Sequence, residues 1–156
     1  MRVIRDRPST VDVEEFLSRP LFAHLATTSK DGPRESPVWF LWENGAMWIL
    51  ASRSTDSFPA RLERDPRCAI GIVDFNPATG LVQHVGFRGR ATVERLDKER
   101  ERRLLARYLG SDETRWDARF RESLGHRDSV FVRFAPETAV ARDVSYLPTG
   151  KVNRKV

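Results

Sequence analysis

Residues 24–75 read HLATTSKDGPRESPVWFLWENGAMWILASRSTDSFPARLERDPRCAIGIVDF and contain three strand-like runs, two tight turns and a short helix. Runs at 22–28 and 34–42, the second rich in aromatic residues, are separated by a Lys-Asp-Gly-Pro break, and Asn44-Gly45 separates the second run from a third at 46–51. Asn-Gly between apolar runs indicates a hairpin, because both residues tolerate the positive φ of a primed turn. The stretch therefore predicts an antiparallel sheet as the centre of the fold.

Composition predicts one globular domain. The chain has 156 residues, 40% of them hydrophobic and 31% charged, which is ordinary for a soluble fold. We expect a single domain at 1–146 and a basic, mobile tail at 147–156. No apolar run reaches the length of a membrane span, and no apolar stretch follows the basic N-terminus, so we expect a cytoplasmic protein with no membrane partner. The single Cys68 excludes an intrachain disulfide and is expected to pack as a small apolar residue.

The charge pattern gives poor support to nucleic-acid binding. Lys and Arg number 27 against 22 Asp and Glu, for a net charge of +5. The basic residues are mostly interleaved with acids, as in RLERDPR and RLDKERERR, and this pattern is typical of a solvated, ion-paired face. Arginine carries nearly all of the positive charge. That choice suits bidentate capture of anions, although genomic base composition would also produce it.

Periodicity and turn residues predict the remaining elements. Ser9 and Thr10 are candidate N-caps for a helix at 11–18, and Pro66 closes a second helix at 58–65. Gly86 and Gly89 are expected to mark a bulge or a close approach in a long strand. Pro136 predicts either two strands or an interrupted edge strand near the C-terminus. The other expected elements are a strand at 67–75, the long strand at 81–94, a helix from 97 that Gly110 ends, a helix at 112–125, and the last strand at 129–144.

These elements predict a β-rich (α+β) fold with six antiparallel strands and short peripheral helices. A small antiparallel barrel closes such a sheet without exposed edges. Periodicity supplies this fold class and no function.

Several short motifs carry a resemblance over residues 14–96. The chain resembles the pyridoxamine 5′-phosphate oxidase-like split-barrel family, which includes flavin-binding and deazaflavin (F420) binding reductases. The resemblance implies a homodimer with cofactor sites at the subunit interface, FMN as the cofactor with F420 as the alternative and haem as a weaker one, and a small-molecule substrate. The motifs are Leu25-Ala26-Thr27 with Asp31-Gly32, Pro37-Val38-Trp39-Phe40, Leu62 with Asp65-Pro66-Arg67, and Gly89-Arg90-Ala91.

The resemblance also implies a phosphate site in the loop after the third run. In the family a Thr or Ser closes that strand, and basic residues follow in the loop and the first turn of the short helix. Ser52 fits the first role, while Arg53, Ser57 and Arg61 complete the expected set. Phe58 and Asp56 depart from the family pattern.

Phe58 stands where the family commonly has lysine, and Asp56 stands near another position that is often basic. A carboxylate a few ångströms from a phosphate opposes binding by about 1 kcal/mol in water. The alternative interpretation is a purely structural loop, in which Asp56 or Ser57 caps the helix and the arginines are solvated.

The flavin ring in this family lies along the second strand, which makes Ser36, Pro37, Val38 and Trp39 the candidate contacts. The alternative role for Trp39 is packing in the core or at the dimer contact, which is the commoner role of so large a ring. His84 lies at about the position of a cofactor-contacting glutamine, with a structural hydrogen-bonding role as the alternative. We find no catalytic nucleophile motif, no phosphate-binding glycine loop and no metal-ligand spacing, so no catalytic or metal residue is assigned.

Three functional classes follow, in order of support. The first is a flavin- or F420-dependent oxidoreductase, in which the cofactor carries the hydride chemistry. The second is a non-catalytic protein of the same fold that binds flavin, haem or another anionic ligand, which the absent lysine favours. The third is a nucleic-acid-binding module, for which no stripe of basic and aromatic residues is found.

Overall fold

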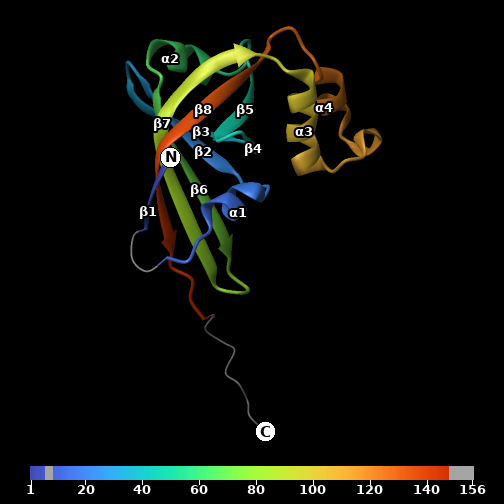
Figure 1. Cartoon of the computed structure of the whole chain (residues 1–156). Coiled ribbons are helices and arrows are strands. Elements are labelled where there is room, and N and C mark those ends of the chain that lie inside the picture. Colours follow the sequence, from blue (N-terminus) through green and yellow to red (C-terminus); the bar gives the residue numbers. More distant parts are fainter. Residues whose placement is uncertain (6–8, 148–156) are drawn as a thin grey trace.

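Eight strands form one sheet in the computed structural model, which describes residues 1–5 and 9–147 (Figure 1). The strands are β1 (Arg2–Arg5), β2 (Ala23–Ser29), β3 (Gly32–Val38), β4 (Leu41–Glu43), β5 (Ala46–Ser52), β6 (Arg67–Asn76), β7 (Leu81–Arg95) and β8 (Ser129–Asp143). The helices are α1 (Val13–Ser18), α2 (Phe58–Arg64), α3 (Lys98–Leu109), the 3-10 turn η1 (Glu113–Arg115) and α4 (Ala118–Ser123).

The β-rich fold with peripheral helices is confirmed, and the strand order is β3-β2-β6-β7-β8-β5-β4. The sheet has eight strands, two more than the six expected. The run at 34–42 divides into β3 and β4, and the N-terminal β1 adds to β8 in parallel. The pairing path ends at β3 and β4, so within the described residues the sheet is open and not a fully closed barrel.

The last strand is continuous, and the predicted interruption at Pro136 is wrong. β8 pairs with β5 up to Phe134 and with β1 from Thr138 onward, so Pro136 lies between the two partners. The N–H that proline lacks is therefore not required by either neighbour on that edge. Opposite Arg88 and Gly89 of β7 the register shifts by one residue, because Arg88 pairs with Thr138 and Gly89 with Pro136. The extra residue of this bulge is therefore on β8, whereas Gly89 is confirmed as a point of close approach, where a Cβ would lie 2.1 Å from Ala135 O.

Asp12, and not Ser9 or Thr10, caps α1. Its carboxylate accepts hydrogen bonds from the N–H groups of Glu14 (2.9 Å) and Glu15 (3.2 Å). The helix begins at Val13, two residues later than expected. Asp12 is then the side chain that adjoins the free N–H groups.

The single helix predicted at 112–125 is also wrong, because two short segments replace it. Asp112 caps η1 and Asp117 caps α4. Trp116 between them is buried, and its indole N–H donates to Gly110 O at 2.8 Å. The local capping residues and the buried indole fix a bend that apolar spacing alone does not reveal.

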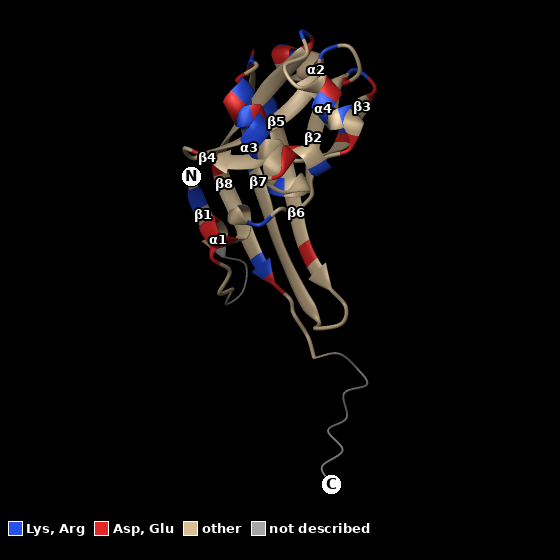
Figure 2. Cartoon of the chain, turned by 90° about the vertical axis from the view of Figure 1, so that its right-hand side faces the viewer, with Lys and Arg blue, Asp and Glu red and all other residues tan. Residues whose placement is uncertain are grey.

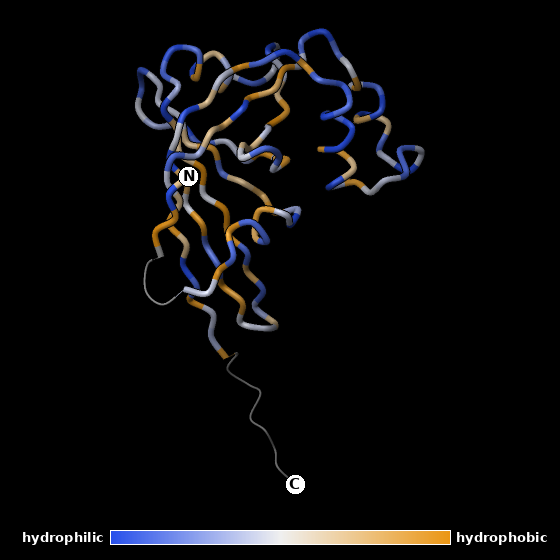
Figure 3. The backbone as a smooth tube through the Cα atoms, in the orientation of Figure 1, coloured by the Kyte–Doolittle hydropathy of each residue, from blue (hydrophilic) through white to orange (hydrophobic). Residues whose placement is uncertain are grey.

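Two hydrophobic cores lie on the two sides of the central strands. The larger fills the barrel, and the smaller packs α3, η1 and α4 against β5 and β8 around Trp48, Trp116 and Phe131. Figure 3 shows the apolar residues concentrated along the strands.

Cys68 is half-buried, and burial raises the pKa of its thiol to about 12, which agrees with the expected packing role. None of the described helices is long and apolar enough to cross a membrane. The expected tail lies, apart from Leu147, outside the described residues.

The bulge makes Gly89 the most sterically constrained glycine described. A Cβ at this position would lie 2.1 Å from the backbone oxygen of Ala135. We predict that Gly89→Ala lowers the free energy of unfolding by about 3 kcal/mol or more, because backbone must move to accommodate the methyl group. Gly71→Ala is the control, since its Cβ would meet only His84 Nε2 at 3.9 Å. Urea denaturation checks both, and equal stability of the two variants would contradict this view of the bulge.

Candidate functional site

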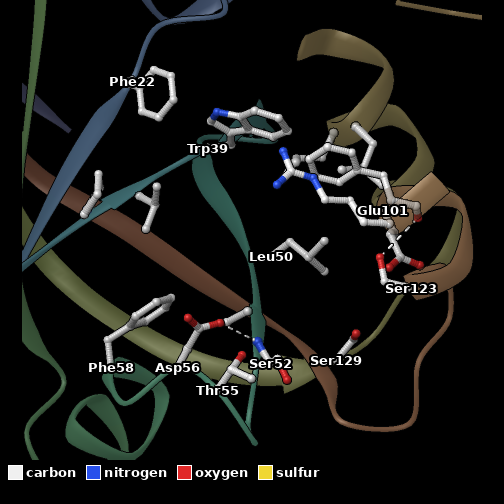
Figure 4. A pocket seen from close by; sticks show the side chains of 17 residues that line it. Phe22, Trp39, Leu50, Ser52, Thr55, Asp56, Phe58, Glu101, Ser123 and Ser129 are labelled. Atoms are coloured by element: carbon white, nitrogen blue, oxygen red, sulfur yellow. Dashed lines mark hydrogen bonds between the residues drawn. The ribbon is translucent and has the colours of Figure 1, made fainter. Parts of the chain in front are cut away.

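Two adjoining pockets share the loop between β5 and α2. One, of about 600 Å³, lies between the sheet and the α3–α4 segment and is mainly apolar (Figure 4). The other, of about 540 Å³, lies between this loop, α2 and the β2–β3 turn and is rich in basic residues. Thr55 and Asp56 line both pockets. We call them the apolar pocket and the basic pocket.

The shared loop is closed by Asp56. Its carboxylate accepts a hydrogen bond from Ser52 N–H at 2.8 Å, and its own N–H donates to Ser52 O at 2.8 Å. Ser57 stands at the N-cap position of α2, yet its side chain makes no capping hydrogen bond. Neither residue therefore caps the helix, and Asp56 instead fixes the end of β5 as a structural brace.

Arg61 is the central cation of the basic pocket. Only 9% of it is exposed, and its Nε donates to Thr27 Oγ1 at 2.8 Å while its Nη1 donates to Ser57 Oγ at 2.6 Å. Within the described part of the chain no carboxylate lies within 4.0 Å of it. Burial lowers the pKa of its guanidinium, and the positive charges of Arg34 and Arg64 lower it further. Such an uncompensated buried cation is stabilised by an anionic ligand.

The other cations of the basic pocket differ in how far they are neutralised. Arg53 forms an ion pair with Glu63 at 2.7 Å, and Arg34 lies 3.8 Å from Asp31. Lys30 and Arg64 have no carboxylate partner among the residues that the structure describes. Figure 2 shows that basic and acidic residues alternate over this end of the molecule. The positive charge open to a ligand therefore comes mainly from Arg61, Arg64 and Lys30, and less from Arg53.

Aromatic side chains form one wall of the apolar pocket. Trp39 stacks on Tyr108, with centroids 4.6 Å apart and 4° between planes, and on Phe120 at 5.5 Å and 23°. Phe22 meets Trp39 edge to face at 6.3 Å. Phe58, the residue at the expected lysine position, is buried and also lines this pocket. Trp39 therefore combines packing against the helices with exposure to the pocket.

Tyr108 fixes α3 against the barrel. Its hydroxyl donates to Leu21 O at 2.8 Å and accepts from Phe40 N–H at 3.2 Å. Arg107, its neighbour, donates to Leu17 O at 2.7 Å. Burial raises the pKa of Tyr108. The helix that closes the apolar pocket is thus anchored to backbone groups of two loops.

Glu101 is a site residue that the sequence interpretation missed. It lies on α3, is 1% exposed and lines the apolar pocket. Burial raises the pKa of its carboxyl, and the Gly125 N–H, Arg102 and Lys98 oppose that rise. One signal was present: Glu101 is three and four positions before Leu104 and Leu105, on the face that the helix buries.

The structure brings most of the predicted residues together in two groups. Pro37, Val38, Trp39 and Ser52 line the apolar pocket, and Arg53, Ser57 and Arg61 line the basic pocket. Ser36 is half-buried and lines neither pocket. His84 also lines neither pocket, because it lies on the part of β7 that pairs with Val73 and Arg142.

The His84 ring lies next to Gly86 and Gly71, and its register partner on β6 is the half-exposed Val73. A Cβ at Gly86 would lie 3.2 Å from His84 Cε1, and one at Gly71 would lie 3.9 Å from Nε2. Burial, followed by the positive charge of Arg142, lowers the pKa of the imidazole. Its assignment as a cofactor contact stays a prediction. The described residues contain no group of three His, Cys, Asp or Glu side chains that could hold a metal ion.

A comparison with protein families finds that the model described as pyridoxamine 5′-phosphate oxidase matches residues 10–142. The chain belongs to this family. A comparison with curated proteins finds no match.

Solved structures share the fold at low sequence identity. The conserved hypothetical protein Rv2991 of Mycobacterium tuberculosis is 19% identical, with a TM-score of 0.68 over 90% of this chain and 89% of that one. A protein described as an F420 reductase is 24% identical, with a TM-score of 0.64 over 84% and 98%. An FAD-binding protein of Mesorhizobium loti is 15% identical, with a TM-score of 0.63 over 88% and 96%. These likenesses support the fold and leave the ligand to be argued from the site.

Proposed function

We propose that this protein binds a flavin or deazaflavin cofactor, FMN or F420, across the two pockets and acts as an oxidoreductase on a small molecule. The observation that carries the proposal is the buried Arg61, which has no carboxylate partner among the described residues and adjoins an aromatic-lined pocket. A ligand with an anionic group and a flat apolar ring matches these two environments. The family comparison supports the same class of ligand.

The residues present fit such a cofactor at both ends. Arg61 and Arg64 would hold the phosphate by charge-assisted hydrogen bonds. Backbone and side chains of Pro37, Val38 and Trp39 would contact the ring from the sheet side. The bound cofactor supplies the hydride chemistry. The chain's own residues orient it, and the α3–α4 wall limits access of water to the ring.

Asp56 and Phe58 reduce the expected affinity without removing the site. Asp56 adds a negative charge to the basic pocket, although the Ser52 N–H partly satisfies it. Phe58 gives the apolar pocket a ring in place of a cation. We expect micromolar affinity, about −8 kcal/mol.

A second candidate is a non-catalytic protein that binds flavin or haem. The Arg53–Glu63 ion pair favours it, because this pair withdraws one expected cation from the phosphate site. A structural neighbour, the flavocytochrome Anf3 of Azotobacter vinelandii, is 16% identical with a TM-score of 0.64, over 91% of this chain and 70% of that one. Parallel titration with haem, followed at the Soret band, distinguishes this candidate.

If Arg61 holds the phosphate, three Arg→Ala variants should lose cofactor affinity to different extents. Arg61→Ala should weaken FMN and F420 binding by about 1.5–3 kcal/mol, roughly 10- to 100-fold, because a charged hydrogen-bond donor is lost. Arg53→Ala should have a smaller effect, since Glu63 already neutralises that charge. Arg67→Ala is the control, because Arg67 is exposed and paired with Asp65 at 2.9 Å. Flavin or tryptophan fluorescence titration measures the affinity of all three variants. Equal losses of affinity would contradict the proposal, because they would mean that the net positive charge of the protein attracts the cofactor and not this pocket.

We also propose a homodimer that buries the outer face of β6 and β7. Val73 and Phe75 of β6 are about half exposed, at 50% and 56%, and their register partners on β7 are His84 and Val82. Val144 donates its N–H to Val82 O and is 48% exposed. Figure 2 shows few charged residues on this part of β6 and β7. Covering an apolar face of this kind is typical of symmetric subunit contacts.

The dimer proposal predicts the mass in solution. Light scattering should give twice the chain mass of 17.9 kDa. Phe75→Glu should shift the mass toward the monomer, because the contact would bury an unpaired charge. A monomeric wild type at micromolar concentration would contradict the proposal, as would a Phe75→Glu variant that remains fully dimeric.

A further inference from the structure

The apolar pocket has a polar end on the helical wall, at Glu101. One carboxylate oxygen, Oε2, accepts a hydrogen bond from Gly125 N–H at 2.9 Å. The other, Oε1, has no hydrogen-bond partner, and no basic group lies within 4.0 Å of the carboxylate, among the residues that the structure describes. Figure 4 shows Glu101 beside Ser123 on the helical side of the pocket, away from Asp56 and Phe58 on the loop side. The carboxyl thus has one oxygen committed to the fold and one available to a ligand.

The surroundings of that oxygen are mainly apolar. Leu50, Leu104 and Leu105 line the same pocket, and Ser123 and Ser129 add hydroxyl groups. Arg119 also lines it, with its guanidinium over the Phe120 ring and 4.0 Å from the Asp117 carboxylate. A ligand that enters must displace water from Oε1. If the ligand brings no hydrogen-bond donor, the oxygen remains buried and unpaired, which is costly. Sites built to bind an O–H or N–H group reject analogues that lack it for this reason.

We propose that Glu101 is the substrate-recognising group of the apolar pocket, and that it selects ring compounds carrying an O–H or N–H donor. Phe120 of the helical wall supplies the contact for the substrate ring. The carboxylate accepts the donor hydrogen through Oε1. The inference rests on the proposed function, because it assigns the substrate end of the same site.

A matched series of small probes tests this selectivity on the cofactor-free wild type. p-Cresol presents an O–H donor, and p-methylanisole is the same ring with that donor capped by a methyl group. We expect p-cresol to bind at least tenfold more tightly than p-methylanisole, measured by calorimetry or by ligand-observed NMR at millimolar concentrations. A ratio near one, or no binding of either probe, would overturn the proposal.

Glu101→Gln should change the preference in a defined direction. The single amide oxygen would be held by the Gly125 N–H, so the variant would present an NH₂ donor to the pocket in place of an acceptor. It should therefore lose the preference for p-cresol and bind p-methylacetophenone, a hydrogen-bond acceptor, at least tenfold more tightly than the wild type does. Glu99→Gln, on the exposed side of the same helix, is the control and should keep the wild-type order.

Unchanged selectivity in Glu101→Gln would also overturn the proposal. Its thermal unfolding midpoint is measured alongside, and if the variant does not fold, the wild-type ratio of p-cresol to p-methylanisole decides alone. Failure here is distinct from failure of the proposed function. The probes need no cofactor, whereas the arginine variants report cofactor binding without these probes.

Discussion

The antiparallel pairing of β7 with β8 is the constraint on which the other elements depend. It runs from Gln83 opposite Asp143 to Arg95 opposite Val130. β6 adds to one side of this pair, and β5 and β1 add to the other. Figure 1 shows both strands as long curved ribbons, with α3 and α4 in the connection between them. The helical wall lies in the connection of this pair, and the β5–α2 loop follows the strand that pairs with β8, so both depend on it.

Within that frame, the loop that Asp56 closes separates two opposite electrostatic environments. Arg61 is a buried cation on the basic side, held by two hydroxyl groups and by no described carboxylate. Glu101 is a buried acid on the apolar side, held by one backbone N–H. Burying either group unpaired is costly. The proposed occupants explain both groups, because the anionic end of the cofactor would lie beside Arg61 and a donor group of the substrate beside Glu101. The aromatic residues around Trp39 suit the cofactor ring.

The sequence predicted the fold well where local signals were strong. Asn44-Gly45 marked its hairpin, with Asn44 at φ 53° and Gly45 at φ 70°, and the loop glycines and prolines marked most strand ends. It failed where tertiary context decided. Pro136 is tolerated because β8 changes partner there, and helix 112–125 breaks because Trp116 is buried. The residues proposed to hold the phosphate came from the family resemblance. The Arg53–Glu63 pair and the pocket-facing Glu101 depend on distances that spacing along the chain does not encode.

The central claim is that the basic pocket holds the anionic end of a cofactor whose ring lies in the apolar pocket. Riboflavin has the ring system of FMN and lacks its phosphate, so parallel titration of the wild type with the two compounds isolates that interaction. Charge-assisted bonds to Arg61 and Arg64 predict that FMN binds at least about tenfold more tightly than riboflavin at low salt. Equal dissociation constants for the two compounds would contradict the account.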